Sequence, residues 1–219
     1  RLLPAGEAAL SAWKMLHQQG FRTLKWKIGV EPIAQELVVF EHLIQALPVV
    51  NLRLDANGGL SLNEAEQWLE RCDRLNATER SVQVEYLEQP LPPHQFTTMQ
   101  SLSDRYRTSI ALDESVATLP QLCTHYDQGW SGIFVIKPAI AGSPIRLRQF
   151  CRSRSIDAVF STVFETAIGR QAGLRLAADL GRDRAVGYEG TFDEFDYFQE
   201  EKWNEELESI GGSEPTTIG

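Results

Sequence analysis

Seven polar residues of types that can do chemistry each lie at the end of a short hydrophobic stretch of the chain. Three are carboxylates, three are lysines and one is a serine. Carboxylate oxygens are ligands for hard divalent cations, and a lysine at a dry site can act as a base. Collected in one place, such groups suit removal of a proton next to a substrate carboxylate while a metal ion stabilises the developing charge. The seven are Lys25, Lys27, Asp55, Glu88, Asp113, Lys137 and Ser161.

The segment Lys25-Trp26-Lys27 is predicted to end a strand, with both lysines on one face, because successive side chains of a strand point to opposite faces. Leu24, Trp26 and Ile28 form the other, apolar face, which we expect to pack against helices. Two neighbouring ammonium groups disfavour each other's charge, so their proximity is expected to lower the pKa of one of them.

The elements that must position these residues alternate between strand and helix. The strands are predicted to end at intervals of 24 to 33 residues, close to the roughly 31 residues per unit of an eight-stranded barrel. We therefore predict an α/β fold of the TIM-type (β/α) barrel class, closed rather than doubly wound, with all seven polar residues at one mouth. The predicted strands cover 23–29, 50–55, 82–87, 108–112, 133–136, 157–160 and 185–188.

The three carboxylates on consecutive strands, Asp55, Glu88 and Asp113, would repel one another in a half-dry mouth unless a cation lay among them. All-oxygen ligands favour Mg²⁺, with Mn²⁺ as an alternative. The lysines would flank this ion from opposite sides. Arg53 shares a face with Asp55, and we interpret it as a counter-charge inside the barrel.

Composition excludes several classes of protein. The 219 residues carry a net charge of −9 and no basic cluster, so we expect no nucleic-acid partner. No apolar run approaches the roughly 18 residues of a membrane span, and we expect no membrane partner. The three cysteines, Cys72, Cys123 and Cys151, fit reduced thiols in a cytoplasmic protein better than disulfides or a zinc site.

Five motifs together resemble the enolase superfamily, in its muconate-cycloisomerase-like branch with lysines on both sides of the metal. They are Lys-Trp-Lys at 25–27, Asp55 in Leu-Asp-Ala-Asn, Glu88 in Glu-Gln-Pro, Asp113 in Leu-Asp-Glu-Ser and Lys137 in Ile-Lys-Pro. Within that branch, four stretches are similar to the o-succinylbenzoate synthase family: 2–6, 20–29, 86–92 and 160–166.

The resemblance implies a lyase that removes water from a succinyl-hydroxycyclohexadiene-carboxylate to give o-succinylbenzoate, in menaquinone or phylloquinone synthesis. It implies that Lys27 takes the proton, Lys25 tunes Lys27, and Lys137 stabilises the intermediate by its charge. Asp55, Glu88 and Asp113 would hold Mg²⁺, and Ser161 and Thr162 would touch the succinyl arm of the small-molecule substrate.

The resemblance also implies a capping domain on the N-terminal side that completes the site. Residues 1–219 read as a barrel domain that is incomplete at its N-terminus, lacking most of the first strand. We therefore expect seven barrel strands and weak or no activity from these residues alone.

Three alternatives remain open from the sequence. One is an N-acylamino-acid racemase or dipeptide epimerase of the same superfamily. Another is a Schiff-base aldolase, in which a desolvated Lys137 attacks a carbonyl without a metal. The third is a barrel without catalytic activity.

Overall fold

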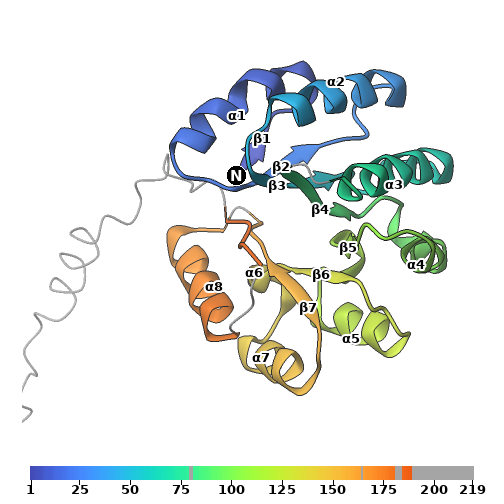
Figure 1. The fold of residues 1–219 in the computed structure, drawn as a ribbon. Coiled ribbons are helices and arrows are strands. Elements are labelled where there is room, and N and C mark those ends of the chain that lie inside the picture. The colour runs from blue at the N-terminus through green and yellow to red at the C-terminus, as the bar shows by residue number, and fades with distance from the viewer. Residues whose placement is uncertain (79–80, 164, 181–183, 189–219) are drawn as a thin grey trace, which may run out of the picture.

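Seven parallel strands lie side by side in the order of the sequence in the computed structural model, which describes residues 1–78, 81–163, 165–180 and 184–188. This order has no reversal, unlike a doubly wound sheet. The sheet curls, and the helices lie outside it (Figure 1). The strands are β1 (Leu2–Leu3), β2 (Thr23–Lys27), β3 (Val50–Asp55), β4 (Val82–Glu88), β5 (Ile110–Leu112), β6 (Ile133–Ile136) and β7 (Asp157–Phe160).

A helix follows almost every strand and returns the chain to the start of the next one, as the alternating pattern predicted. The longer helices are α1 (Ala9–Gln18), α2 (Ile33–Ala46), α3 (Leu62–Asn76), α4 (Phe96–Arg105), α5 (Leu119–Asp127), α7 (Pro144–Ser153) and α8 (Ala167–Leu180). Shorter ones are α6 (Pro138–Ala141) and the 3₁₀ turns η1 (Gly6–Ala8), η2 (Pro93–Gln95) and η3 (Glu114–Val116).

The two faces of the sheet have separate hydrophobic clusters. On the outer face, Trp26 of β2 stacks with Phe40 of α2, and both rings contact Trp68 of α3, with centroids 5.3 to 6.5 Å apart. On the inner face, a smaller cluster fills part of the barrel interior and leaves the strand ends polar. Its members are Tyr86, Ala111, Ile133, Val135 and Val159.

The predicted (β/α) barrel fold is confirmed as a curled sheet of seven parallel strands, but the predicted strand at 185–188 is wrong. Within the described residues, only Gly187 continues the sheet, through a single parallel bridge to Ser161, and no ladder joins this segment to β1. The next side chain, Tyr188, packs onto Gly173 of α8. The described sheet is therefore a curled, incomplete barrel that runs from the short β1 to β7.

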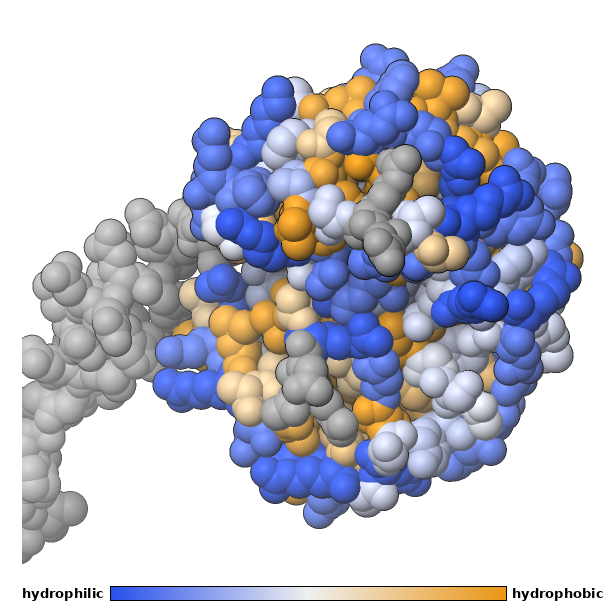
Figure 2. Space-filling model, in the orientation of Figure 1, coloured by the Kyte–Doolittle hydropathy of each residue, from blue (hydrophilic) through white to orange (hydrophobic). Residues whose placement is uncertain are grey.

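The surface of the described residues is mixed in character. On the face drawn in Figure 2, hydrophobic residues reach the surface in separate areas, and hydrophilic residues lie between them. No described helix combines the length and the apolar character that spanning a membrane would require.

Candidate active site

A β-bulge in β4 turns Glu88 toward the inside of the barrel. Pairing with β3 shifts between Leu52 and Arg53, so that Glu85 is the extra residue of β4. Side chains alternate along a strand, and one extra residue reverses the faces of all that follow. The bulge therefore places Glu88 beside Asp55, its partner in the ladder.

Lys25 holds these two carboxylates together. Its Nζ lies 2.7 Å from Asp55 Oδ2 and 2.7 Å from Glu88 Oε1. The Lys25 side chain is 22% exposed, and the Glu88 side chain is only 1% exposed. Burial alone would lower the pKa of Lys25, but the negative charges of Glu88 and Asp55 outweigh burial and raise it. The expectation that neighbouring lysines lower a pKa is therefore wrong for Lys25.

Asp113 and Lys137 form the second charged pair at the mouth. Lys137 Nζ donates a hydrogen bond of 2.7 Å to Asp113 Oδ2, and the Asp113 side chain is 3% exposed. Asp113 follows β5 and Lys137 follows β6, so adjacent strand ends supply the two groups. The structure thus pairs the three carboxylates with two lysines.

Glu88 still has a free ligand position in this arrangement. Its Oε2 is buried without a hydrogen-bond partner. Burial, together with the charges of Asp55 and Asp113, raises the pKa of Glu88 to about 8, although Lys25 opposes the shift. Within the described residues, no three acidic, histidine or cysteine side chains stand ready to enclose a metal. A carboxylate oxygen without a partner, close to two other carboxylates, nevertheless suits a hard cation. The amines of Lys25 and Lys137 would have to move away from the carboxylates when the cation binds.

Lys27 differs from the other two lysines. It ends β2 and is half-buried, and its ammonium group makes no hydrogen bond or ion pair with any part of the chain that the structure describes. The loop after it is fixed by Glu36, a buried side chain of α2 that accepts three backbone N–H groups. Gly29 and Val30 donate at 2.9 Å and Glu31 at 3.1 Å. Lys27 is therefore an available amine on a rigidly held strand end.

Gln89 links the strand ends that carry Glu88 and Asp113, a role that sequence reasoning missed. Its side chain is fully buried, and Oε1 accepts the N–H of Asp113 at 3.0 Å and of Ser115 at 3.2 Å. Its φ of +36° is rare for any residue other than glycine and is held by these contacts. Only the motif Glu-Gln-Pro at 88–90 marked this position in the sequence.

An ion-pair network lies toward the end of the barrel where the strands begin, away from the mouth. Arg53 Nε lies 2.7 Å from Glu85 Oε2, and Arg184 Nη1 lies 2.6 Å from Glu85 Oε1. Arg184 also binds Asp157 at 2.6 Å. The interpretation of Arg53 as an internal counter-charge is confirmed, and the extra residue of the bulge provides its partner.

A cavity of about 820 Å³ runs along the inside of the sheet and is lined by all the predicted site residues except Glu88. Its charge is mostly positive, which suits an anionic small molecule. The basic residues that line it are Arg1, Arg22, Lys25, Lys27, Arg53, Lys137 and Arg170, and the acidic ones are Asp55 and Asp113.

Ser161 and Thr162 line the same cavity, but their hydroxyl groups already donate hydrogen bonds within the protein. Ser161 Oγ donates to Gly187 O at 3.1 Å, and Thr162 Oγ1 donates to Glu165 Oε2 at 2.7 Å. The structure therefore places both residues at the mouth without leaving their protons free for a ligand.

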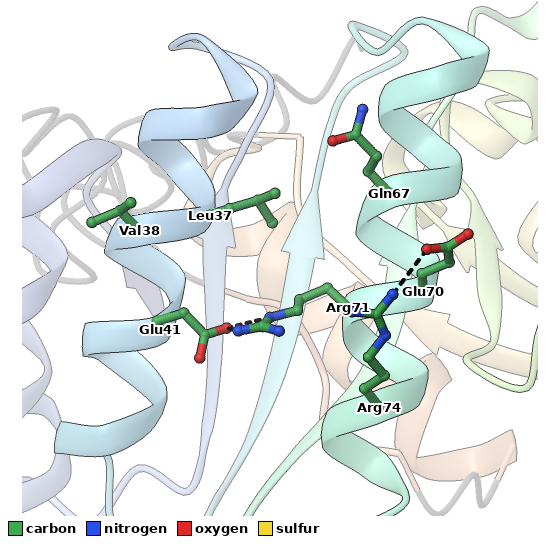
Figure 3. Close-up of a pocket in the computed structure, with 7 residues that line it drawn as sticks. All are labelled: Leu37, Val38, Glu41, Gln67, Glu70, Arg71 and Arg74. Atoms are coloured by element: carbon green, nitrogen blue, oxygen red, sulfur yellow. Dashed lines mark hydrogen bonds and ion pairs between the residues drawn. The ribbon is translucent and has the colours of Figure 1, made fainter.

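A second pocket of about 370 Å³ lies on the outer surface, between α2 and α3 (Figure 3). Arg71 reaches across it to Glu41, and Arg74 pairs with Glu70 at 3.1 Å. Both guanidinium groups have carboxylate partners there. This pocket also lies on the helices, away from the strand ends, so we do not assign it a function.

Comparison with known proteins identifies the family. A family model described as Enolase C-terminal domain-like matches residues 7–213. The chain belongs to the enolase C-terminal domain-like family. The resemblance inferred from the five motifs is confirmed at this level.

Individual relatives include two enzyme types. The chain is 39% identical over 191 residues to o-succinylbenzoate synthase from Thermosynechococcus vestitus. The matched region covers 85% of this chain and 58% of that protein. The chain is also 27% identical over 219 residues to N-succinylamino acid racemase from Thermus thermophilus, covering 99% of this chain and 56% of the racemase.

A solved structure gives the same result for the fold. It is o-succinylbenzoate synthase from Thermosynechococcus elongatus BP-1 with Mg in its active site, with a TM-score of 0.78 and 38% identity. The similarity covers 85% of this chain and 58% of that one. The chain thus spans about half the length of the relatives that it matches.

Proposed function

We propose that the chain forms the barrel of a Mg²⁺-dependent o-succinylbenzoate synthase. The observation that carries this proposal is its similarity to a known o-succinylbenzoate synthase along most of its length. The site geometry supports it, because carboxylates and lysines gather at one mouth of a barrel with a cationic cavity. The pathway is then the synthesis of menaquinone or phylloquinone, and the compartment is the cytoplasm.

Asp55, Glu88 and Asp113 would hold the ion in this proposal. When bound, Mg²⁺ or Mn²⁺ stabilises negative charge on the substrate carboxylate as the neighbouring C–H bond breaks. Lys25 lies between Asp55 and Glu88 and keeps them within reach of each other. It must give up part of its contact with them when a cation binds.

Lys27 is the base in this proposal, because its amine has no competing partner among the described residues and because Lys27 is the last residue of a fixed strand. It takes the proton next to the carboxylate, and the electrons of the C–H bond move toward that carboxylate. The protonated Lys27 then gives this proton to the departing hydroxyl group. Water leaves, the ring becomes aromatic, and Lys27 returns to its neutral form. Lys137 adds positive charge nearby.

Removal of the Lys27 amine tests this proposal in the protein that contains this chain. Conversion of the cyclohexadiene substrate should be observed as formation of the aromatic product, and Lys27→Ala should lower kcat by roughly 10² to 10⁴-fold. EDTA should abolish turnover, and Mg²⁺ should restore it. Turnover that survives either treatment would exclude the proposed chemistry.

Racemisation of an N-succinylamino acid is the second candidate, because a racemase is among the relatives. It needs the same proton removal with a cationic amine on the opposite side. Parallel assays of the two substrates decide between the reactions. An aldolase is disfavoured because the Lys137 amine pairs with Asp113, and trapping of a carbonyl substrate on Lys137 with borohydride would revive it.

We further propose that a part of the protein outside these residues covers the mouth. Four apolar side chains on loops and helix starts around the rim are 44% to 67% exposed: Val30, Leu62, Ile140 and Ile168. Exposed apolar groups around a polar site indicate a contact surface. Residues 1–219 alone should then show weak or no turnover, and full activity from them would contradict this.

A further inference from the structure

Two buried hydrogen-bond donors without acceptors belong to residues that line the cavity. Arg170 Nε and Tyr188 Oη are both buried, and neither has a hydrogen-bond partner within the described ranges. Tyr188 as a whole residue is only 8% exposed. Both residues line the cavity that also contains Lys27 and Lys137.

A glycine on α8 brings the Tyr188 phenol close to the helical turn that carries Arg170. Arg170 and Gly173 are three residues apart and therefore share a face of that helix. Tyr188 Oη lies 2.1 Å from the point where a Cβ atom on Gly173 would stand. The phenol thus occupies the space that any side chain at 173 would fill, one turn from Arg170.

The neighbouring polar groups do not accept from these donors in the structure. Ser161 and Thr162 act as donors themselves, as described above. Glu165 Oε2 accepts both from Thr162 and, at 2.8 Å, from the N–H of Val163. Burial, with the charge of Glu165, raises the pKa of Tyr188, so its phenol keeps the proton that it can donate.

A guanidinium that is partly withdrawn from water without a counter-charge is costly. Arg71 and Arg74 on the outer surface, by contrast, each have a glutamate partner (Figure 3). An anion supplied by a ligand would remove the cost at Arg170, and charge-assisted hydrogen bonds to carboxylate are among the stronger ones in proteins.

We propose that Arg170 and Tyr188 bind the second carboxylate of a dicarboxylate substrate, while the first lies at the Lys27 end of the cavity. This inference rests on the proposed function for the position of the first carboxylate. It names the succinyl arm as the part recognised, which o-succinylbenzoate and N-succinylamino acids share. The arm is therefore selected by Arg170 and Tyr188, rather than by Ser161 and Thr162.

The test compares two probes in the protein that contains this chain, in the presence of Mg²⁺. The probes are o-succinylbenzoate and its methyl ester on the succinyl carboxylate, and calorimetry gives Kd for each. The native protein should bind the diacid at least about tenfold more tightly than the ester, since a hydrogen bond to a charged group is worth that much or more. Arg170→Met should reduce this preference to less than about threefold, with a smaller reduction for Tyr188→Phe.

Two variants serve as matched controls. Arg175→Met removes an exposed guanidinium from the same helix, and Tyr126→Phe removes a half-buried phenol from α5. Both should keep the full preference for the diacid. If Arg170→Met does not fold, Arg170→Lys replaces it in the test, because lysine keeps the charge but lacks the Nε–H donor. Arg170→Lys should prefer the diacid less than the native protein does, but more than is expected for Arg170→Met.

The outcomes separate this inference from the proposed reaction. An unchanged preference in Arg170→Met or Arg170→Lys, or a native protein that binds neither probe, overturns the anion site. A preference that depends on Arg170 in a protein that does not dehydrate the cyclohexadiene substrate supports the anion site and refutes the reaction. Loss of affinity for both probes alike in Arg170→Met would also overturn it.

Discussion

Replacement of Gln89 by leucine should weaken both the fold and the metal site. The side chain is fully buried and makes two kinds of contact. Oε1 accepts from the backbone of Asp113 and Ser115, and Nε2 donates to Leu91 O and Ser115 Oγ, each at 2.8 Å. Leucine has a similar size but can make none of these hydrogen bonds.

The cost follows from the groups that are left behind. Two backbone N–H groups and one carbonyl lose their partner in a buried place, and each unsatisfied group costs about 1 to 3 kcal/mol. Water can hydrogen-bond some of these groups and so reduces the total cost. We therefore expect the free energy of unfolding to fall by about 3 to 5 kcal/mol. This is a large part of the roughly 5 to 15 kcal/mol that stabilises a typical domain. Asp113 would also lose its fixed position relative to Glu88.

Urea unfolding and Mg²⁺ calorimetry measure the two effects. Gln89→Leu should shift the unfolding midpoint strongly and raise the Kd for Mg²⁺. Gln100→Leu is the control, because its side chain makes only an exposed hydrogen bond to Gln128 O, and it should change stability by less than about 0.5 kcal/mol. A Gln89→Leu protein with native stability and native affinity for Mg²⁺ would refute the reasoning.

Three further predictions follow from single side chains. Glu36→Ala should lower the free energy of unfolding by about 2 to 4 kcal/mol in urea titrations, because three loop N–H groups lose their acceptor, and a neutral effect would show that the loop does not need it. Lys25→Met leaves two buried carboxylates unpaired. Thermal melts of this variant should show a lower Tm than the native protein without Mg²⁺, and a larger increase in Tm when Mg²⁺ is added. An increase in Tm equal to that of the native protein would contradict the pairing. A thiol reagent should label Cys123 in the folded state but not Cys72, since burial raises the pKa of the Cys72 thiol, and labelling of Cys72 at an equal rate would show that this core opens.

Much of the fold could be predicted because its signals are local. Ser61 and Glu64 have the spacing of a capping box in the sequence, and the box forms, with Glu64 N donating to Ser61 Oγ at 3.3 Å. Gly20, a residue type that favours the end of a helix, has a positive φ of +93° after α1. The helix α8 runs from Ala167 to Leu180. Caps and periodicity depend on residues within one or two turns, so one sequence is enough to read them.

The bulge in β4 shows where local signals stop. The sequence has broken alternation at Glu85, Tyr86 and Leu87, but the residue that becomes unpaired depends on the register with β3. That register also decides whether Glu88 faces inward. The polar residue at the strand end could be predicted, whereas its orientation depended on a neighbouring strand.

The partners of the charged groups could not be predicted for the same reason. The sequence indicated that Asp55, Glu88 and Asp113 needed a nearby cation, but it did not show that Lys25 and Lys137 would serve in that role. Long side chains choose partners by three-dimensional distance, as the network between Arg184 and Glu85 also shows.

The most direct test of the central claim is a crystal structure with Mn²⁺ in place of Mg²⁺, with its position taken from anomalous scattering. The account predicts one peak bound by carboxylate oxygens of Asp55, Glu88 and Asp113, at roughly 2.0 to 2.3 Å, with the Lys25 amine moved away from at least one of them. A peak at another place, or a peak that touches fewer than two of these carboxylates, would contradict it.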